Sequence, residues 1–276
     1  MEKQKSFKIA SLNAHGWRDK SNHYSFLQFL DLLKPLDIDI LALEEVYHPD
    51  HYKIENKKEP VVVLQHLAEQ LDCNYFFFSA NHKKFGNAIL VKKKFQSQKI
   101  AFQKLKVKNF QKRSFGIVSI KLENENFNFC VLHLDHISEQ TRLEQVKIMN
   151  NFLTENKIVP HFLIGDFNSL SSKSDYSKKK NLQIFETRLK NSWESPVYDI
   201  YQEITSNLNY IDSWKAIHPN QLDAFSCWIG TRIDYIFIQN SLINSKFTLD
   251  SFDMIENDAT DHSLLLLQIS LIEEKK

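Results

Sequence analysis

The chain has 276 residues, 42% hydrophobic and 25% charged, which suits a globular protein with a large core and excludes a disordered or fibrous chain. The three cysteines, Cys73, Cys130 and Cys227, form no Cys-x-x-Cys pair, which argues against a disulfide framework and against a zinc site. A net charge of +1 excludes a protein that is basic or acidic throughout.

The first half of the chain predicts two helices among a run of strands. One amphipathic helix begins after a cap at Ser21 or Asn22, runs to Leu33 and stops before Pro35, and a second covers 60–71. Apolar runs predict the strands 7–13, 38–46, 75–80, 87–92, 100–107, 115–122 and 127–134.

The second half mixes helices and strands. A helix with an apolar face is predicted over 139–154, and 175–207 predicts two helices separated near Pro196. The predicted strands are 161–165, 232–238, 247–255 and 264–272. We find no repeat and no Pro/Gly-rich linker, so we expect a single domain over 1–276. This order of elements predicts an α/β fold of two mixed β-sheets packed face to face, with helices outside.

Polar residues recur where the predicted strands end. Loops at strand ends usually carry functional sites, and carboxylates, amides and imidazoles together suit a hard cation with acid/base groups. The strand-end residues are Asn13, Glu44, Glu45, His133, Asp135, His136, Asp166, Asn168, Asp261 and His262, and Asp234 interrupts the apolar run 233–238.

Seven short segments resemble, in order, the motifs of the endonuclease/exonuclease/phosphatase superfamily. They are Ser-Leu-Asn-Ala (11–14), Leu-Ala-Leu-Glu-Glu-Val (41–46), Gly-Asn-Ala-Ile (86–89), His-Leu-Asp-His (133–136), Gly-Asp-Phe-Asn-Ser (165–169), Arg-Ile-Asp-Tyr-Ile (232–236) and Thr-Asp-His (260–262). The segments 174–177 and 191–196 resemble one eukaryotic branch of it. The resemblance implies a DNase I-like four-layer α/β/β/α sandwich with a helical insertion at about 171–213.

The resemblance also implies a phosphate-ester hydrolase that uses Mg²⁺, or Mn²⁺, for in-line attack of water on phosphorus. Glu45 matches the metal-binding glutamate, Asn13 the amide that orients the metal site, and Asp261 an acid that binds metal or holds an imidazole. Alternatives are a solvated strand-end acid at Glu45 and a turn residue at Asn13. Glu44 stands where the family often has Gln, so we expect it behind the metal-binding residues or exposed. Some abasic-site endonucleases have an acid at the position of His15, which argues against that substrate.

Five residues match the catalytic positions of the family. Asp166 would orient or deprotonate the attacking water, Asn168 would bind a phosphate oxygen, and His262 would stabilise developing charge. The alternative for the Asp-x-Asn pair is a helix cap or an Asx-turn. Asp234 would support a histidine, or else pair with Arg232 as a structural acid. His133 resembles the general acid that faces the leaving group, and its alternative is a neutral core histidine.

Three further residues are candidate phosphate or substrate ligands. Asn87 would line the phosphate pocket, His136 follows the same strand as His133, and Arg142 lies on the next helix. The alternative for Asn87 is a strand-start residue after Gly86, and the alternative for Arg142 is a surface ion pair.

A basic segment bears on the substrate. Between Lys83 and Arg113 there are eleven Lys or Arg residues and no Asp or Glu. This segment attracts a polyanion or is a solvated pair of strands. The leading hypothesis is a nuclease acting as a phosphodiesterase on nucleic acid. Alternatives are a phosphomonoesterase or lipid phosphodiesterase on the same fold, and a non-catalytic nucleic-acid-binding or scaffold protein.

The location follows from what the sequence lacks. The N-terminal residues 1–8 are polar and carry no signal peptide, and the most apolar run, 264–272, is too short to span a bilayer. We expect an intracellular monomer, cytoplasmic or nuclear, with no membrane partner.

Overall fold

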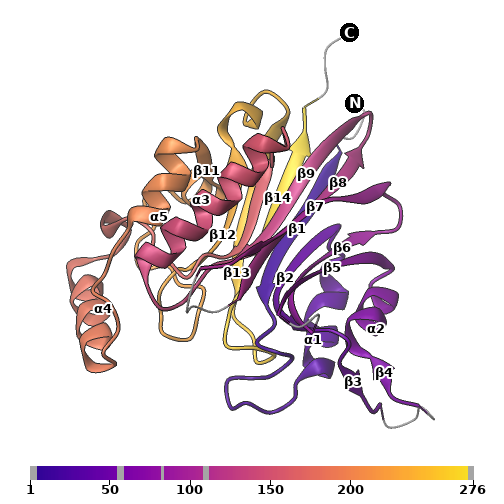
Figure 1. Cartoon of the computed structure of the whole chain (residues 1–276), viewed down its shortest axis with the longest axis horizontal. Coiled ribbons are helices and arrows are strands. Elements are labelled where there is room, and N and C mark those ends of the chain that lie inside the picture. Colours follow the sequence, from indigo (N-terminus) through magenta and orange to yellow (C-terminus); the bar gives the residue numbers. More distant parts are fainter. Residues whose placement is uncertain (1–4, 55–58, 82–83, 108–111, 273–276) are drawn as a thin grey trace.

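The computed structural model describes residues 5–54, 59–81, 84–107 and 112–272 and contains two six-stranded sheets that face each other (Figure 1). The first sheet has the order β13 (Phe247–Ile255), β14 (Leu264–Leu271), β1 (Ser6–Asn13), β2 (Ile40–Tyr47), β6 (Phe85–Lys92) and β5 (Cys73–Asn81). The second has the order β11 (Tyr210–Asp212), β12 (Asp234–Gln239), β10 (Phe162–Asp166), β9 (Glu125–His133), β8 (Arg113–Leu122) and β7 (Ser97–Leu105). Each sheet is mixed, because β1 pairs with β2 and β9 with β10 in parallel, while their neighbours are antiparallel.

Helices cover the outer faces of both sheets. Helices α1 (Phe26–Leu33) and α2 (Val63–Gln70) pack on the first sheet, and α3 (Glu139–Glu155) and α5 (Asp199–Gln202) pack on the second. The remaining elements are α4 (Lys178–Lys190), a π-helical turn (Glu203–Asn207), α6 (Ser213–Ile217), the hairpin β3 (His51–Tyr52) and β4 (Val61–Val62), and 3-10 turns at Lys34–Leu36, Lys173–Asp175 and Asn240–Leu242. The predicted four-layer α/β/β/α sandwich is confirmed.

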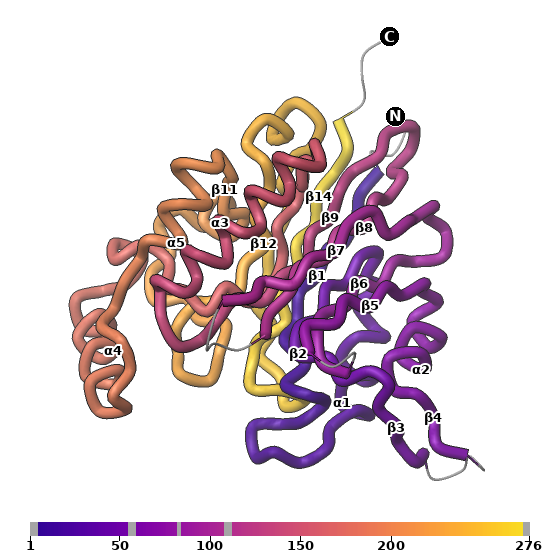
Figure 2. Tube along the Cα trace, in the orientation of Figure 1, coloured from indigo at the N-terminus to yellow at the C-terminus, as the bar shows by residue number. Residues whose placement is uncertain are grey.

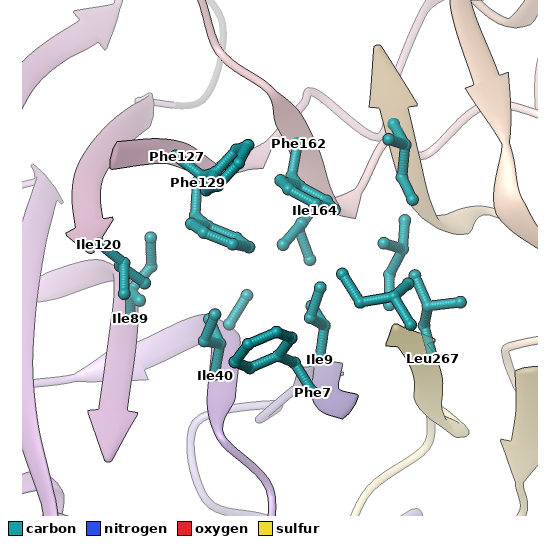
Figure 3. Packing of buried hydrophobic residues seen from close by; sticks show 14 of the residues in the cluster. Phe7, Ile9, Ile40, Ile89, Ile120, Phe127, Phe129, Phe162, Ile164 and Leu267 are labelled. Carbon is teal, nitrogen blue, oxygen red and sulfur yellow. The ribbon is translucent and has the colours of Figure 1, made fainter. Parts of the chain in front are cut away.

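Alternating side chains of the central strands fill two different layers. Ile9 and Ile40 face the other sheet, whereas their neighbours Ala10 and Leu41 face the helices. Within the inter-sheet layer, the rings of Phe129 and Phe162, from neighbouring strands of the second sheet, stack with centroids 4.4 Å apart (Figure 3). Strands buried on both faces need apolar residues at every position, which is why these segments read as continuous hydrophobic runs.

Several element bounds differ from the sequence-based ones. The first helix starts at Phe26, because Asn22 closes a turn onto Asp19 with a positive φ of 65° and cannot cap the helix. The second helix starts at Val63, after the short strand Val61–Val62. In the predicted insertion, Pro196 does separate two helical segments, α4 and α5. No helix within the described ranges has the length and apolarity to cross a membrane.

Candidate active site

Strand register brings the predicted site residues to one end of the sandwich. In the first sheet Asn13 lies opposite Glu44, and in the second sheet Asp166 lies opposite both His133 and Asp234. Parallel neighbours end at the same edge, so the carboxyl ends of β1, β2, β9 and β10 collect there. The path of the chain is followed most easily in the tube view (Figure 2).

Asp166 is at the centre of the group and is almost completely buried. Its Oδ2 accepts a hydrogen bond from Asn13 Nδ2 at 3.0 Å, and its Oδ1 accepts one from the backbone N–H of Asn168 at 2.8 Å. Burial, and then the negative charge of Asp234, raise the pKa of Asp166 to about 7. The Asp-x-Asn pair therefore combines the predicted Asx-turn with a carboxylate facing the other sheet.

Asp234 holds His262. The Nδ1–H of His262 donates to Asp234 Oδ2 at 2.9 Å, and Ser226 Oγ donates to the same oxygen at 2.6 Å. Burial disfavours the charged imidazole, yet the negative charge of Asp234 raises the pKa of His262 well above its ordinary value. Arg232 pairs with other acids, so Asp234 is not the structural partner of that arginine.

His133 has a partner that the sequence did not indicate. Arg113 Nη1 lies 3.0 Å from His133 Nδ1, and because arginine only donates, Nδ1 must accept. The hydrogen of the neutral ring is then on Nε2, which lies 3.4 Å from Asp166 Oδ2. Asn168 Nδ2, 2.9 Å from the same nitrogen, is itself a donor and bonds the backbone oxygen of Leu134 instead. Burial, and then the charge of Arg113, lower the pKa of His133 well below its ordinary value. The general-acid role of His133 stays a prediction.

A bulge aims two consecutive glutamates in different directions. The pairing of β2 with β6 shifts register between Leu43 and Val46, and Glu45 has a positive φ of 52°. Glu44 is fully buried and accepts a hydrogen bond from Ser11 Oγ at 3.3 Å. The side chain of Glu45 is 27% exposed and its carboxylate lies 3.9 Å from His133 Nε2.

Glu44 lies beneath the site rather than in it. Burial, followed by the charges of Asp234 and Asp166, raises the pKa of Glu44 well above its ordinary value. A Cβ at position 165 would lie 3.0 Å from Glu44 Oε1 and 2.0 Å from the backbone oxygen of Leu132, so Gly165 is required there. Of the two expectations for Glu44, behind the metal-binding residues or exposed, its burial agrees with the first, because the bulge turns it into the space between the sheets.

The predicted metal ligands offer the oxygen atoms that a hard divalent cation prefers. Among the described residues, the carboxylate of Glu45 accepts no hydrogen bond, so it is available to an ion. Asp261 Oδ1 lies 3.6 Å from His15 Nδ1 and 3.9 Å from His262 Nε2. Asn13 is less available, because its Oδ1 accepts from the backbone N–H of His15 and its Nδ2 donates to Asp166.

A second group of side chains, two carboxylates and one imidazole, is compact enough to hold one ion. Ligand atoms of Asp166, Asp234 and His262 lie within 4.8 Å of one another. Within this group His262 Nδ1 and Asp234 already share a hydrogen bond, and Glu45 and Asp261 remain the predicted metal ligands. Cys227, the nearest thiol, is buried and lies 3.2 Å from the backbone oxygen of Thr231.

The three predicted phosphate ligands have different surroundings. Asn87 is buried in β6 and donates from Nδ2 to the backbone oxygen of Ser114 at 2.9 Å, which leaves one N–H of its amide. His136 is exposed on the loop after β9. Both remain predictions.

The contacts of Arg142 do not fit the predicted phosphate ligand. Its side chain is buried, Nε donates to Glu139 at 2.7 Å, Nη1 donates to the backbone oxygen of Asp135, and Nη2 pairs with Glu194. Glu139 also accepts from Ser169 Oγ at 3.0 Å. Arg142 is therefore held by two carboxylates away from the cluster and fixes the loop that follows Asn168, instead of binding phosphate.

Arg232 forms a second buried network behind the site. Its guanidinium donates to Asp212 at 2.6 Å, lies 3.5 Å from Asp175, and packs over the ring of Tyr235. Both acids belong to the predicted insertion, whereas Arg232 stands two residues before Asp234. The insertion and the catalytic strand thus share one buried ion-pair network.

The basic segment divides between the two ends of the sandwich. Lys92, Lys93 and Lys94 follow the far end of β6 and pair there with acids. Arg113 is buried against His133, and Lys83 and Lys108 lie outside the described residues. Because β6 runs antiparallel to β2, the start of β6 lies at the site end and its last residues lie at the far end.

A hollow of about 680 Å³ adjoins His262 and Asp261. Its lining includes Lys20, Phe225 and Trp228, and the Trp228 side chain is 64% exposed. The backbone N–H of Trp228 donates to the backbone oxygen of Asp261 at 2.9 Å, which fixes the loop beside the catalytic pair. A larger hollow of about 820 Å³ lies at the opposite end, around Phe95, and contains none of the strand-end residues of the site.

Comparisons with known proteins follow this geometry. The model of the Endonuclease/Exonuclease/phosphatase family matches residues 10–262. A DNA-(apurinic or apyrimidinic site) endonuclease 2 from Xenopus laevis is 28% identical over 122 residues, which are 36% of this chain and 23% of the relative. The alignment thus spans about a quarter of that relative's length.

Two solved structures from Bacteroides thetaiotaomicron have the same fold. An endonuclease/exonuclease/phosphatase family protein gives a TM-score of 0.66 at 16% identity, covering 99% of this chain and 100% of that one. A mannosyl-6-phosphatase gives a TM-score of 0.65 at 18% identity, covering 97% of this chain and 100% of that one. At these identities the likeness shows the fold alone.

Proposed function

The chain belongs to the endonuclease/exonuclease/phosphatase family of phosphate-ester hydrolases, and we propose that it is a divalent-metal-dependent phosphodiesterase acting on nucleic acid. The observation that carries the proposal is the continuity between the carboxylate group around Asp166 and the aromatic hollow beside His262. A scissile phosphate at the carboxylates would leave its neighbouring nucleoside facing Trp228.

The residues present fit a hard cation, held by Glu45 and Asp261 with Asn13 behind them. When bound, Mg²⁺ or Mn²⁺ neutralises charge on the phosphate and on the leaving oxygen. The open carboxylate of Glu45 at the mouth of the site supports this choice.

Asp166 orients the attacking water. Two hydrogen bonds, from Asn13 and from the backbone of Asn168, fix the direction of its carboxylate. Asn168 would in turn donate to a phosphate oxygen. Because a fixed carboxylate needs no reorganisation when the water attacks, the barrier to hydrolysis is lowered.

The two histidines have different roles. Asp234 orients His262, whose free Nε2–H would donate to a phosphoryl oxygen as negative charge develops. Arg113 fixes the tautomer of His133, so its Nε2–H is a neutral donor toward the same space. We therefore assign charge stabilisation to His262 and positioning of the phosphate to His133.

The substrate class rests on the hollow. An exposed tryptophan, a phenylalanine and a lysine beside the phosphate position suit a base and its backbone. The name of the Xenopus relative specifies DNA as its substrate, which supports the same class. A phosphomonoester or a lipid diester would use the carboxylates without needing Trp228.

Hydrolysis by the purified protein tests the proposal. The substrates are single-stranded RNA, single-stranded DNA, abasic duplex DNA, a phosphomonoester and the base-free diester bis(p-nitrophenyl) phosphate, each with Mg²⁺, Mn²⁺ or EDTA. We expect metal-dependent cleavage of a polynucleotide that falls about a thousandfold in Asp166→Asn and in Glu45→Gln. Trp228→Ala should raise KM for the polynucleotide about tenfold and leave the base-free diester unchanged.

Other outcomes identify the alternatives. Cleavage of the phosphomonoester alone would assign the protein to the phosphatases. Polynucleotide binding without any product would support the non-catalytic reading. Near-normal activity in Asp166→Asn would contradict the site itself.

A further inference from the structure

Helix α4 carries a row of apolar side chains in solvent. Leu182 is 57% exposed, Phe185 47% and Leu189 69%, and at 3.6 residues per turn the three lie within about 60° of one another. The opposite side of the helix is anchored, because Ile184 is buried with Tyr176 and Cys227. We call Leu182, Phe185 and Leu189 the α4 ridge.

Lysines lie along one side of the α4 ridge. By helical spacing Lys178 lies in line with it, and Lys179 and Lys190 lie on one flank. Glu186 is the one acid of α4, and it lies on the same flank. A row of large apolar side chains bordered by lysines is typical of a helix that lies on an anionic lipid surface.

The α4 ridge lies at the same end of the molecule as the candidate site. A Cβ at Gly230, in the hollow beside His262, would lie 2.7 Å from Lys180 Nζ. The backbone N–H of Ser177, which precedes α4, donates to Asp223 Oδ1 at 2.7 Å. In Figure 1 the helix projects from the edge of the sandwich.

We propose that the α4 ridge docks the protein on an anionic membrane surface, with Leu182, Phe185 and Leu189 in the lipid and the lysines at the headgroups. Lipid is favoured over nucleic acid because two of the three ridge side chains are leucines, which gain little from stacking on a base. The charge of α4, four lysines and one arginine against one glutamate, matches an anionic partner.

This docking goes beyond the proposed function and does not depend on which phosphodiester is cleaved. It is peripheral and uses no membrane-spanning helix. It differs from the sequence-based expectation of no membrane partner, because that expectation concerned signal and spanning segments.

Vesicle flotation of the full chain tests the proposal in EDTA, where no turnover occurs. We expect binding to phosphatidylcholine vesicles that contain phosphatidylserine and about tenfold less to phosphatidylcholine alone. The variant L182Q/F185Q/L189Q should lose at least about tenfold in affinity, with helix content kept because Gln is a good helix former. Lys179→Gln should lose about fivefold.

The matched control is Val159→Ser, which removes an apolar side chain that is 49% exposed and follows the C-terminal end of α3. Its vesicle binding should equal that of the unchanged protein. Equal binding by the ridge variant, or no vesicle binding at all, would overturn the proposal. Two further results would also overturn it. One is a dimer in sedimentation that disappears in the ridge variant, and the other is oligonucleotide binding, without vesicle binding, that disappears in the ridge variant. Trp228→Ala, which tests the proposed function, should leave vesicle binding unchanged.

Discussion

The acidic residues have different partners at the two ends of the sandwich. At the far end five acids pair with lysines: Asp37–Lys92, Asp39–Lys94, Asp72–Lys93, Glu123–Lys5 and Glu125–Lys246. At the site end Glu44, Asp166 and Asp234 are buried together, and the charges near them are those of His262 and Arg113. The fold neutralises one set of carboxylates and leaves the other for an ion and a substrate.

The difference has an energetic meaning. Buried carboxylates without cationic partners oppose folding, since desolvation disfavours their charged forms. Such an arrangement persists where function requires it, and it separates a site from a structural ion-pair cluster. Loss of a charged group that acts on the substrate should therefore lower activity more than stability, whereas loss of an ion pair at the far end should lower stability and leave activity unchanged.

After Asp166→Asn and Glu45→Gln, the next largest effect is expected for Asp234→Asn. The amide still accepts from His262 Nδ1 but no longer supplies the charge that favours the imidazolium. We expect kcat on the polynucleotide to fall about a hundredfold, with KM changed little. Steady-state kinetics beside Asp72→Asn, an exposed acid of the far end, provides the control. Equal kcat values for the two variants would remove Asp234 from the catalytic group.

A smaller effect, on stability, is expected for Glu44→Gln. Because burial and the charges of Asp234 and Asp166 raise the pKa of Glu44, the folded protein keeps a proton that the unfolded chain releases. This proton on Glu44 stabilises the folded protein. The stabilisation is fully present below the unfolded pKa of about 4.5 and is lost as the pH rises through the folded pKa. Gln avoids that loss, so the variant should be about 2 kcal/mol more stable at pH 8 and no more stable at pH 4.

Urea unfolding in EDTA across this pH range measures the difference. Ser11→Ala, which removes the hydroxyl donor to Glu44 but keeps the carboxyl, is the matched control, and its stability should still fall between pH 4 and pH 8. A stability difference between Glu44→Gln and the unchanged protein that stays constant from pH 4 to pH 8 would contradict the interpretation.

The smallest effect belongs to the far end. Asp39 is buried, accepts from the backbone N–H of Lys8 at 3.0 Å and pairs with Lys94 at 2.6 Å. Asp39→Asn should lower the free energy of unfolding by about 1 kcal/mol and leave kcat unchanged. Lys94→Gln removes the other partner of the same pair and should be no more costly. A loss of activity in either variant would mean that the two ends are not independent.

The sequence predicted the acids of the site better than their partners. Asp166 and Asp234 were visible because each is a charged residue in an apolar run, and strand register then placed them opposite each other. Arg113 was not visible as a site residue, since it belongs to a basic segment and reaches His133 only through the pairing of β8 with β9. Such contacts depend on sheet register, which a local pattern does not contain.

For Arg142, too, the sequence did not indicate the contacts that the side chain makes. Its helix and its spacing from His133 were predicted, but its partner Glu194 lies 52 residues further along the chain. Similarly, the direction of Glu44 depends on a bulge against β6 that no motif records. Residue types and strand ends were therefore predictable, whereas the choice between ligand and structural partner required the packed fold.

The network around Arg232 has a consequence for how this branch of the family can diversify. Asp175 and Asp212 come from the two ends of the helical insertion, and Arg232 comes from the segment that leads into Asp234. Deleting the insertion, or replacing it with a loop from a relative, would leave a buried guanidinium without either counter-charge. The insertion therefore cannot be removed or exchanged alone, and we expect a relative without it to have a different residue at position 232.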